Sequence, residues 1–111
     1  MDESIPSITV GDVDELDQPF YLDVREQDEY QAGHIPDVTW YALGTLESVV
    51  GSLPTTRPVV CICRSGARSA HATAFLRGQG VDAINLEGGM QAWAAFGLDV
   101  VCDDGSDGRV I

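Results

Sequence analysis

The sequence predicts an α/β fold, a single domain in which a parallel sheet is covered by helices on both faces. Short apolar runs rich in β-branched residues alternate along the chain with segments of helical apolar spacing. This alternation is typical of strand–helix–strand units, whose crossover helices pack on the two sides of a parallel sheet. A length of 111 residues with 44% hydrophobic residues fits one globular domain that needs neither disulfides nor metal to hold its core.

The first half of the chain predicts several elements in order. Thr9 is the expected N-cap of the first helical turn, with Asp12 in the capping-box position. In the acidic segment that follows, carboxylates occupy the first helical turn and Gly33 is the expected stop. The elements are an extended piece with a helical turn (7–16), a buried strand (19–25), the acidic helix (26–33), a turn with a short β-prone run (34–43) and an apolar helix (44–53).

The second half contains the longest apolar run, "RPVVCIC" (57–63), which predicts the central strand of the sheet. A loop separates this strand from the next helix. The polar, Gly-rich residues 103–111 are expected to form a flexible tail, which leaves 5–102 as the folded domain. The remaining predicted elements are a helix that starts at Ser69, a strand (81–86), and a helix (87–97) with Met90, Trp93 and Ala94 directed inward.

Charge and cysteine content narrow the function classes. A net charge of -12 and a pI near 4.1 argue against binding to nucleic acid or to an anionic membrane. The chain has no apolar run of about 18 residues that would predict a membrane span. Three cysteines, with no secretion signal in residues 1–7, indicate free thiols in a reducing compartment, the cytoplasm. No cofactor is expected, and no metal, because Cys61 and Cys63 lack a second Cys/His pair.

We expect the chemistry in the loop that follows the central strand. In a strand–loop–helix arrangement, backbone N–H groups and the helix N-terminus converge on one point and stabilise an anion there. Cys63 stands at the carboxyl end of the strand, where neighbouring cations and the helix N-terminus lower the pKa of a thiol and create a nucleophilic thiolate. The loop residues are Arg64, Ser65, Gly66, Ala67, Arg68 and Ser69.

Individual residues in and around this loop have distinct expected roles. Gly66 permits the backbone bend that turns the amides inward, and Ser69 either caps the helix or lends a hydroxyl to the site. Cys61 lies inside the apolar run and is expected to belong to the core. We expect Cys102, next to the tail, to be a bystander and His34 to be a structural hydrogen-bonding residue at a turn.

Three segments, "LDVREQDEYQAGHIP", "CRSGARS" and "NLEGGMQAW", resemble rhodanese-like sulfurtransferase domains in order and spacing. The resemblance runs from about Ile8 to Val101. It implies a five-stranded parallel sheet and a Cys63 persulfide, formed with a small anionic donor such as thiosulfate and passed to cyanide, a thiol or a protein. Arg64 and Arg68 are suited to draw in and balance such a dianion.

The resemblance also suggests that Asp23 and Arg25, at the end of the second predicted strand, brace the loop. In that arrangement Asp23 pairs with Arg68. The alternative is an ordinary surface ion pair, which contributes little to stability.

Two other functions compete with sulfur transfer. Cysteine phosphatases and arsenate reductases use an anion loop with five residues between cysteine and arginine, whereas Cys63 and Arg68 are separated by four. A non-catalytic rhodanese-like binding or regulatory module is the second alternative, because a fold does not fix its function. Such a module is expected to have lost the loop cysteine or arginine, and both are present here.

Overall fold

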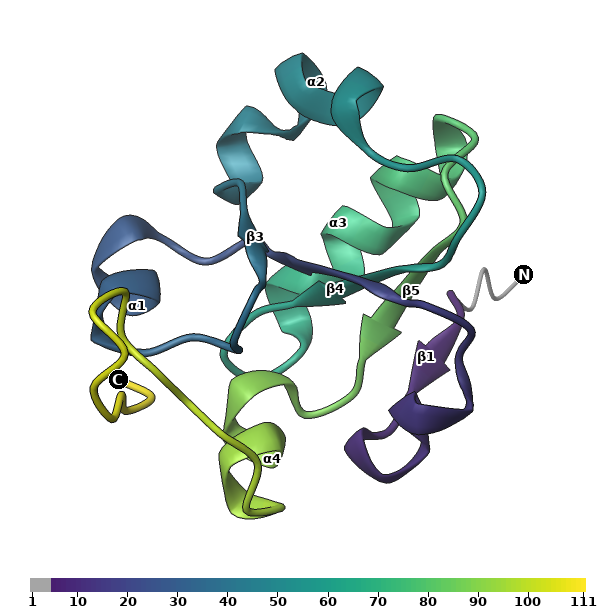
Figure 1. Cartoon of the computed structure of the whole chain (residues 1–111). Coiled ribbons are helices and arrows are strands. Elements are labelled where there is room, and N and C mark those ends of the chain that lie inside the picture. The colour runs from purple at the N-terminus through teal and green to yellow at the C-terminus, as the bar shows by residue number, and fades with distance from the viewer. Residues whose placement is uncertain (1–4) are drawn as a thin grey trace.

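The computed structural model describes residues 5–111 as one five-stranded parallel sheet with helices on both faces (Figure 1). The strands lie in the order β1-β5-β4-β2-β3, and every neighbouring pair is parallel. This confirms the predicted α/β fold class, with the strand that precedes Cys63 in the middle of the sheet. Residues 1–4 lie outside the described residues. They belong to the N-terminal stretch in which the sequence shows no secretion signal.

The elements alternate along the chain as the sequence predicts. Strands β1 to β5 span Ser7–Ile8, Phe20–Asp23, Thr39–Trp40, Val59–Ile62 and Ala83–Leu86. Helices α1 to α4 span Gln27–Ala32, Leu46–Val49, Ala67–Gly78 and Gly89–Ala95. The 3₁₀ helices η1 to η3 span Val10–Glu15, Leu43–Thr45 and Val50–Ser52.

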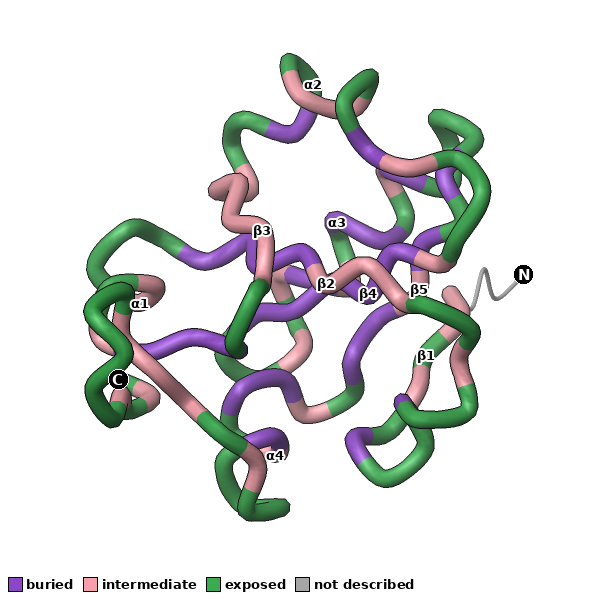
Figure 2. The backbone as a smooth tube through the Cα atoms, in the orientation of Figure 1, coloured by how far each residue is buried: buried purple, intermediate pink, exposed green. Residues whose placement is uncertain are grey.

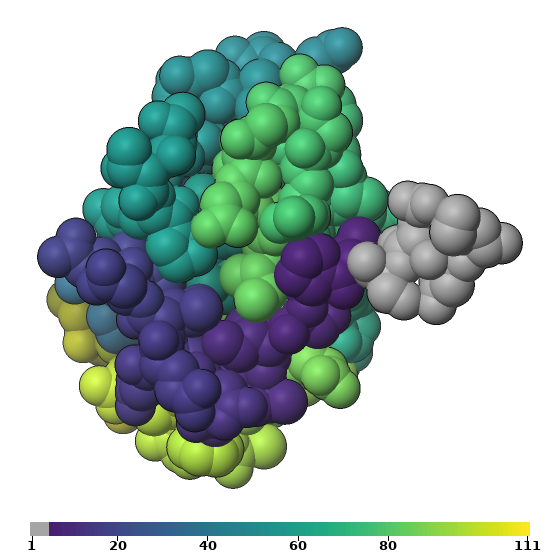
Figure 3. Space-filling model, turned by 90° about the vertical axis from the view of Figure 1, so that its right-hand side faces the viewer, coloured from purple at the N-terminus to yellow at the C-terminus, as the bar shows by residue number. Residues whose placement is uncertain are grey.

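Strand β4 is buried along its whole length because both of its faces are covered. Successive side chains of a strand point to opposite faces. Val59 and Cys61 therefore pack with α2 and α3, whereas Val60 and Ile62 pack with η1 and α4. Figure 2 shows buried backbone, in purple, in the middle of the molecule around β4. Figure 3 shows the N-terminal segment, in purple and blue, crossing the lower half of one side of the molecule.

The predicted helical turn after β1 is the 3₁₀ helix η1, and Thr9 occupies its N-cap position, but within residues 5–111 the Thr9 side chain makes no capping hydrogen bond. Two other local predictions are wrong. The predicted helix 44–53 consists of the end of η2 and the short pieces α2 and η3, because its polar residues and Gly51 leave only a few apolar anchors against the sheet. Ala94 is exposed, since Met90 and Trp93 alone occupy the buried side of the short helix α4.

The C-terminal residues 103–111 lie against the domain beside α1 (Figure 1). The backbone N–H of Arg109 donates to the Ala32 carbonyl at 2.9 Å, and Val110 packs against the core cluster on the α4 side. Gly33 makes this close approach possible, because a Cβ there would lie 2.5 Å from the Arg109 nitrogen. The flexibility of this tail and the boundary at 102 stay predictions, but the tail has defined contacts.

Candidate active site

The loop after β4 lies at the carboxyl edge of the parallel sheet, where ligands of open α/β sheets bind. Cys63 directly follows β4, and α3 begins at Ala67 rather than at the predicted Ser69. Gly66 precedes the helix with φ +105°, a left-handed conformation that favours glycine. The predicted bend at Gly66 is therefore present.

The Cys63 thiol is enclosed by hydrogen-bond donors of this loop. The residue is 1% exposed, and its Sγ lies 3.1 Å from the Gly66 backbone nitrogen and 3.3 Å from the Ser69 hydroxyl. Burial alone raises the pKa of the Cys63 thiol, but hydrogen bonds from the Ser69 hydroxyl and from the amides of Ser69, Gly66 and Ser65 lower it below its ordinary value. Hydrogen bonds within the loop are therefore the main interactions that favour the thiolate.

Asn85 is a residue of this site that the sequence analysis missed. It lies on β5 and is 7% exposed; its Oδ1 accepts a hydrogen bond from Ser69 at 2.5 Å, and its Nδ2 donates to the Gly66 carbonyl at 3.1 Å. A hydroxyl has one proton, so Ser69 donates either to Asn85 or to the Cys63 sulfur. Asn85 thus fixes the loop backbone and competes for the same proton. No pattern in the sequence around Asn85 predicts its contacts with Ser69 and Gly66.

The first turn of α4 holds the start of the loop in place. The backbone nitrogen of Met90 donates to the Cys63 carbonyl at 2.8 Å, and that of Gln91 donates to the Arg64 carbonyl at 3.0 Å. Gly89 has φ +54°, and a Cβ there would lie 2.3 Å from the Cys63 carbonyl oxygen. This position therefore requires glycine for both its conformation and its space.

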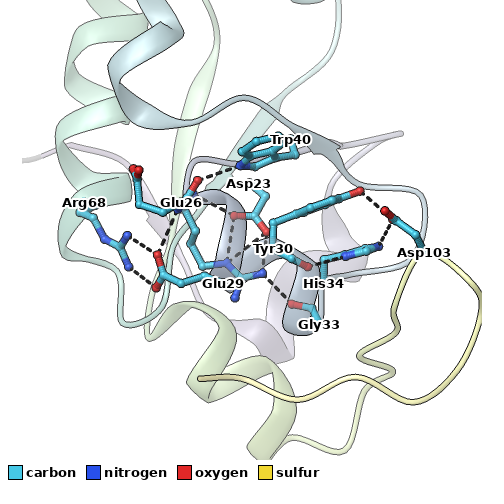
Figure 4. A network of polar contacts seen from close by, with 10 residues as sticks. Asp23, Glu26, Glu29, Tyr30, Gly33, His34, Trp40, Arg68 and Asp103 are labelled. Carbon is cyan, nitrogen blue, oxygen red and sulfur yellow. Dashed lines mark hydrogen bonds and ion pairs between the residues drawn. The ribbon is translucent and has the colours of Figure 1, made fainter.

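The two loop arginines contact other groups of the protein. Arg64 Nε donates to the main-chain oxygen of Ile111 at 3.0 Å. Arg68 binds Glu29 of α1 through two parallel hydrogen bonds of 2.7 and 2.8 Å (Figure 4). Arg68 lowers the pKa of the Glu29 carboxyl to about 2, and Glu29 raises the pKa of Arg68. Glu29 is the second site residue that the sequence analysis missed.

The predicted pair between Asp23 and Arg68 is wrong. Asp23 instead pairs with Arg25, whose Nη2 donates to Asp23 Oδ2 at 2.8 Å and to the Gly33 carbonyl at 2.7 Å. The two side chains are 1% and 0% exposed, so the alternative of an ordinary surface pair is wrong as well. This buried pair ties the end of β2 to the end of α1. The sequence pattern does not show which arginine pairs with Asp23, because that choice depends on how the side chains are placed in the fold.

Helix α1 is fixed by an aromatic stack and by the tail (Figure 4). The Tyr30 ring stacks between Trp40 and His34, with centroid distances of 5.2 and 4.0 Å. Asp103 accepts a hydrogen bond from the Tyr30 hydroxyl at 3.2 Å and lies 3.3 Å from His34 Nε2. His34 Nδ1 lies 2.8 Å from the Tyr30 carbonyl. The contacts of His34 are those of the structural residue that the sequence predicts.

All three cysteines are free thiols in the described part of the chain. Cys61 is fully buried on the α3 side of the sheet, and burial raises its pKa to about 11. Cys102 lies by the tail, with its Sγ 3.5 Å from the Ala32 carbonyl. Between residues 5 and 111, no group of three or more His, Cys, Asp or Glu side chains is arranged to hold a metal ion. No helix in that range has the length and apolarity needed to cross a membrane.

A scan against protein-family models matches residues 12–96 to the rhodanese-like domain. The chain belongs to the rhodanese-like domain family. This confirms the resemblance seen in the sequence.

Individual relatives agree with this family. The domain is 40% identical over 85 residues to a sulfurtransferase of Allochromatium vinosum, covering 76% of this chain and 79% of that protein. It is 32% identical over 75 residues to the thiosulfate sulfurtransferase GlpE of Pseudomonas savastanoi, covering 67% and 71%. A crystal structure of a rhodanese-related protein from Thermoplasma volcanium superposes with a TM-score of 0.82 at 32% identity, covering 88% and 99%.

Proposed function

We propose that this rhodanese-like domain is a sulfurtransferase that carries sulfane sulfur as a persulfide on Cys63. The supporting observation is the cradle of the Ser69 hydroxyl and the loop amides, which lowers the pKa of the Cys63 thiol. A thiolate at neutral pH attacks without a general base. Names of relatives that include sulfurtransferase and thiosulfate sulfurtransferase point the same way.

The proposed transfer has two steps. The Cys63 thiolate attacks the outer sulfur of a donor such as thiosulfate, the sulfur–sulfur bond of the donor breaks, and sulfite leaves with the electron pair. The terminal sulfur of the persulfide is then an anion that the loop amides stabilise. A thiophilic acceptor, such as cyanide, a thiol or a protein thiol, attacks this outer sulfur and regenerates the Cys63 thiolate. The free thiols suit a reducing compartment, so we place the reaction in the cytoplasm.

A non-catalytic binding module is the second candidate, and one observation favours it. Cys63 is 1% exposed, so a donor must reach the sulfur through a small opening or a movement of the surrounding side chains. A cysteine phosphatase is disfavoured, because four residues between Cys63 and Arg68 make the loop one residue shorter than an oxyanion loop of that class.

The decisive experiment measures thiosulfate-dependent thiocyanate formation together with the intact mass of the protein. We expect a Cys63 adduct of about 32 Da, one sulfur atom, after incubation with thiosulfate. Cys63→Ser removes both the adduct and the turnover. Cys61→Ser, two residues earlier on the same strand, is the matched control and keeps both. Folded protein with neither adduct nor turnover from any donor favours the binding module, and Cys63-dependent hydrolysis of an aryl phosphate favours the phosphatase.

A further inference from the structure

Arg68 is the cation that is best placed to meet a donor anion, and Glu29 is already bound to it. Arg68 stands on the first turn of α3, and its guanidinium is close enough to Cys63 for the thiolate to contribute to its raised pKa. Its side chain is 35% exposed, whereas that of Glu29 is 14% exposed. Two parallel bonds of 2.7 and 2.8 Å engage the planar fork of the guanidinium. A carboxylate therefore already fills the face of Arg68 that would bind an oxyanion in the same bidentate way.

The other guanidinium groups at this edge of the sheet are also engaged. Arg25 is buried against Asp23, and Arg64 donates to the Ile111 oxygen. Glu26 adds a further carboxylate near Arg68, since it too contributes to the raised pKa of that residue. A dianion that approaches Cys63 thus meets the carboxylates of Glu29 and Glu26 beside Arg68. The donors that face the Cys63 sulfur are the Gly66 amide and the Ser69 hydroxyl, which suit a single anionic sulfur.

We propose that Glu29 is a specificity-determining residue that holds Arg68 away from dianionic sulfur donors and so favours donors of lower charge, such as organic hydropersulfides. This inference rests on the proposed function and names its donor class. Thiosulfate reacts only after its oxygens displace the Glu29 carboxylate from Arg68. An organic hydropersulfide needs no such displacement, because it has no sulfonate group.

Transfer from a hydropersulfide uses the same nucleophile and balances without a further reactant. The Cys63 thiolate attacks the outer sulfur of R–S–SH. A new bond forms between Cys63 Sγ and that sulfur, and the sulfur–sulfur bond of the donor breaks. The organic thiolate leaves with the electron pair, while the proton stays on the new persulfide or passes to water. A thiolate leaving group has one negative charge, compared with two on sulfite released from thiosulfate.

The test compares two donors in Glu29→Gln and in Asp28→Asn. Gln keeps an oxygen that accepts from the Glu26 backbone nitrogen, as Glu29 does at 3.0 Å, but it removes the charge that holds Arg68. In Glu29→Gln we expect the KM for thiosulfate to fall about fivefold with kcat unchanged. This fold-change corresponds to ~1 kcal/mol, which is the energy of a partly exposed ion pair. The KM for a simple alkyl hydropersulfide, which has no carboxylate or sulfonate, is expected not to change. Asp28 is exposed on the same helix, so Asp28→Asn removes an equal charge without releasing Arg68.

A double variant separates release of Arg68 from a general loss of negative charge. In Glu29→Gln with Arg68→Gln, the KM for thiosulfate is expected to return to the wild-type value, because no free guanidinium is left. The proposal is overturned if Glu29→Gln raises or does not change this KM, if both donors respond equally, or if Asp28→Asn has the same effect. Failure of the proposed function looks different: folded wild-type protein then gains no Cys63 adduct from either donor.

Discussion

Replacing Gly89 with alanine tests how strongly the Cys63 loop depends on the first turn of α4. The alanine Cβ would lie 2.3 Å from the Cys63 carbonyl oxygen and 2.8 Å from the Arg64 carbonyl carbon and oxygen. Contacts under 3.0 Å do not persist, so the loop backbone has to move by at least about 0.7 Å. This movement weakens the bond from the Met90 nitrogen to the Cys63 carbonyl, now 2.8 Å long.

The expected loss of stability is the sum of three effects. An alanine in the left-handed region costs about 1–2 kcal/mol, overpacking against backbone about 1–3 kcal/mol, and the weakened hydrogen bond about 1 kcal/mol. We therefore expect Gly89→Ala to reduce the free energy of unfolding by about 3–6 kcal/mol. Gly97 is the matched control: its φ is +89°, and no described atom lies within 4 Å of a Cβ at that position. Gly97→Ala isolates the conformational effect, about 1–2 kcal/mol.

The assay is urea unfolding of both variants, followed by the pH dependence of Cys63 alkylation. A displaced loop no longer aims its amides at the sulfur, so Gly89→Ala is expected to shift the pKa of Cys63 upward and to slow persulfide formation. Gly97→Ala leaves both unchanged. Equal stability of the two variants, together with an unaltered alkylation profile for Gly89→Ala, would refute the reasoning that α4 positions the loop.

Three further variants probe the site. Ser69→Ala removes a donor that lowers the pKa of Cys63, so the midpoint of thiolate alkylation moves to higher pH; an unmoved midpoint contradicts this role. Cys61→Ala leaves persulfide formation intact and reduces the free energy of unfolding by about 1–2 kcal/mol; loss of the adduct would contradict the assignment of Cys61 to the core. The Glu29 carboxyl has its pKa lowered to about 2, so its pairing with Arg68 stabilises the protein above pH 4.5 and is lost as the pH falls towards 2. Glu29→Gln therefore removes about 1 kcal/mol at neutral pH and much less at pH 2, as measured by urea unfolding at each pH.

Sequence patterns predicted the parts of this fold that depend on local chemistry. The apolar run that ends at Cys63 became β4, because β-branched residues buried on both faces suit a central parallel strand. Gly66 adopts the left-handed conformation that the loop requires. The three short segments at 44–53 were mistaken for one helix, because apolar spacing alone does not show how much sheet is available to cover a helix.

The partners of charged and polar side chains were not predictable in the same way. Asp23 and Glu29 are both carboxylates near one edge of the sheet, and the sequence alone does not decide which of them Arg68 selects. In the structure Arg25 is the nearest cation to Asp23, which leaves Glu29 for Arg68. Asn85 contacts the loop only because β5 lies beside β4 in the sheet, so its role follows from strand order rather than from any local pattern.

The groups that stabilise an anionic sulfur on Cys63 also affect the second step of the proposed transfer, in which the acceptor attacks that sulfur. A persulfide held too strongly would resist attack by the acceptor, because stabilisation of an intermediate raises the barrier that follows it. Backbone amides and the Ser69 hydroxyl stabilise one anionic sulfur through hydrogen bonds, whereas a free guanidinium beside the sulfur would add a full charge. By pairing with Arg68, Glu29 offsets that charge. If Cys63 carries a persulfide as proposed, the same contact that would disfavour a dianionic donor would also keep the outer sulfur available for transfer.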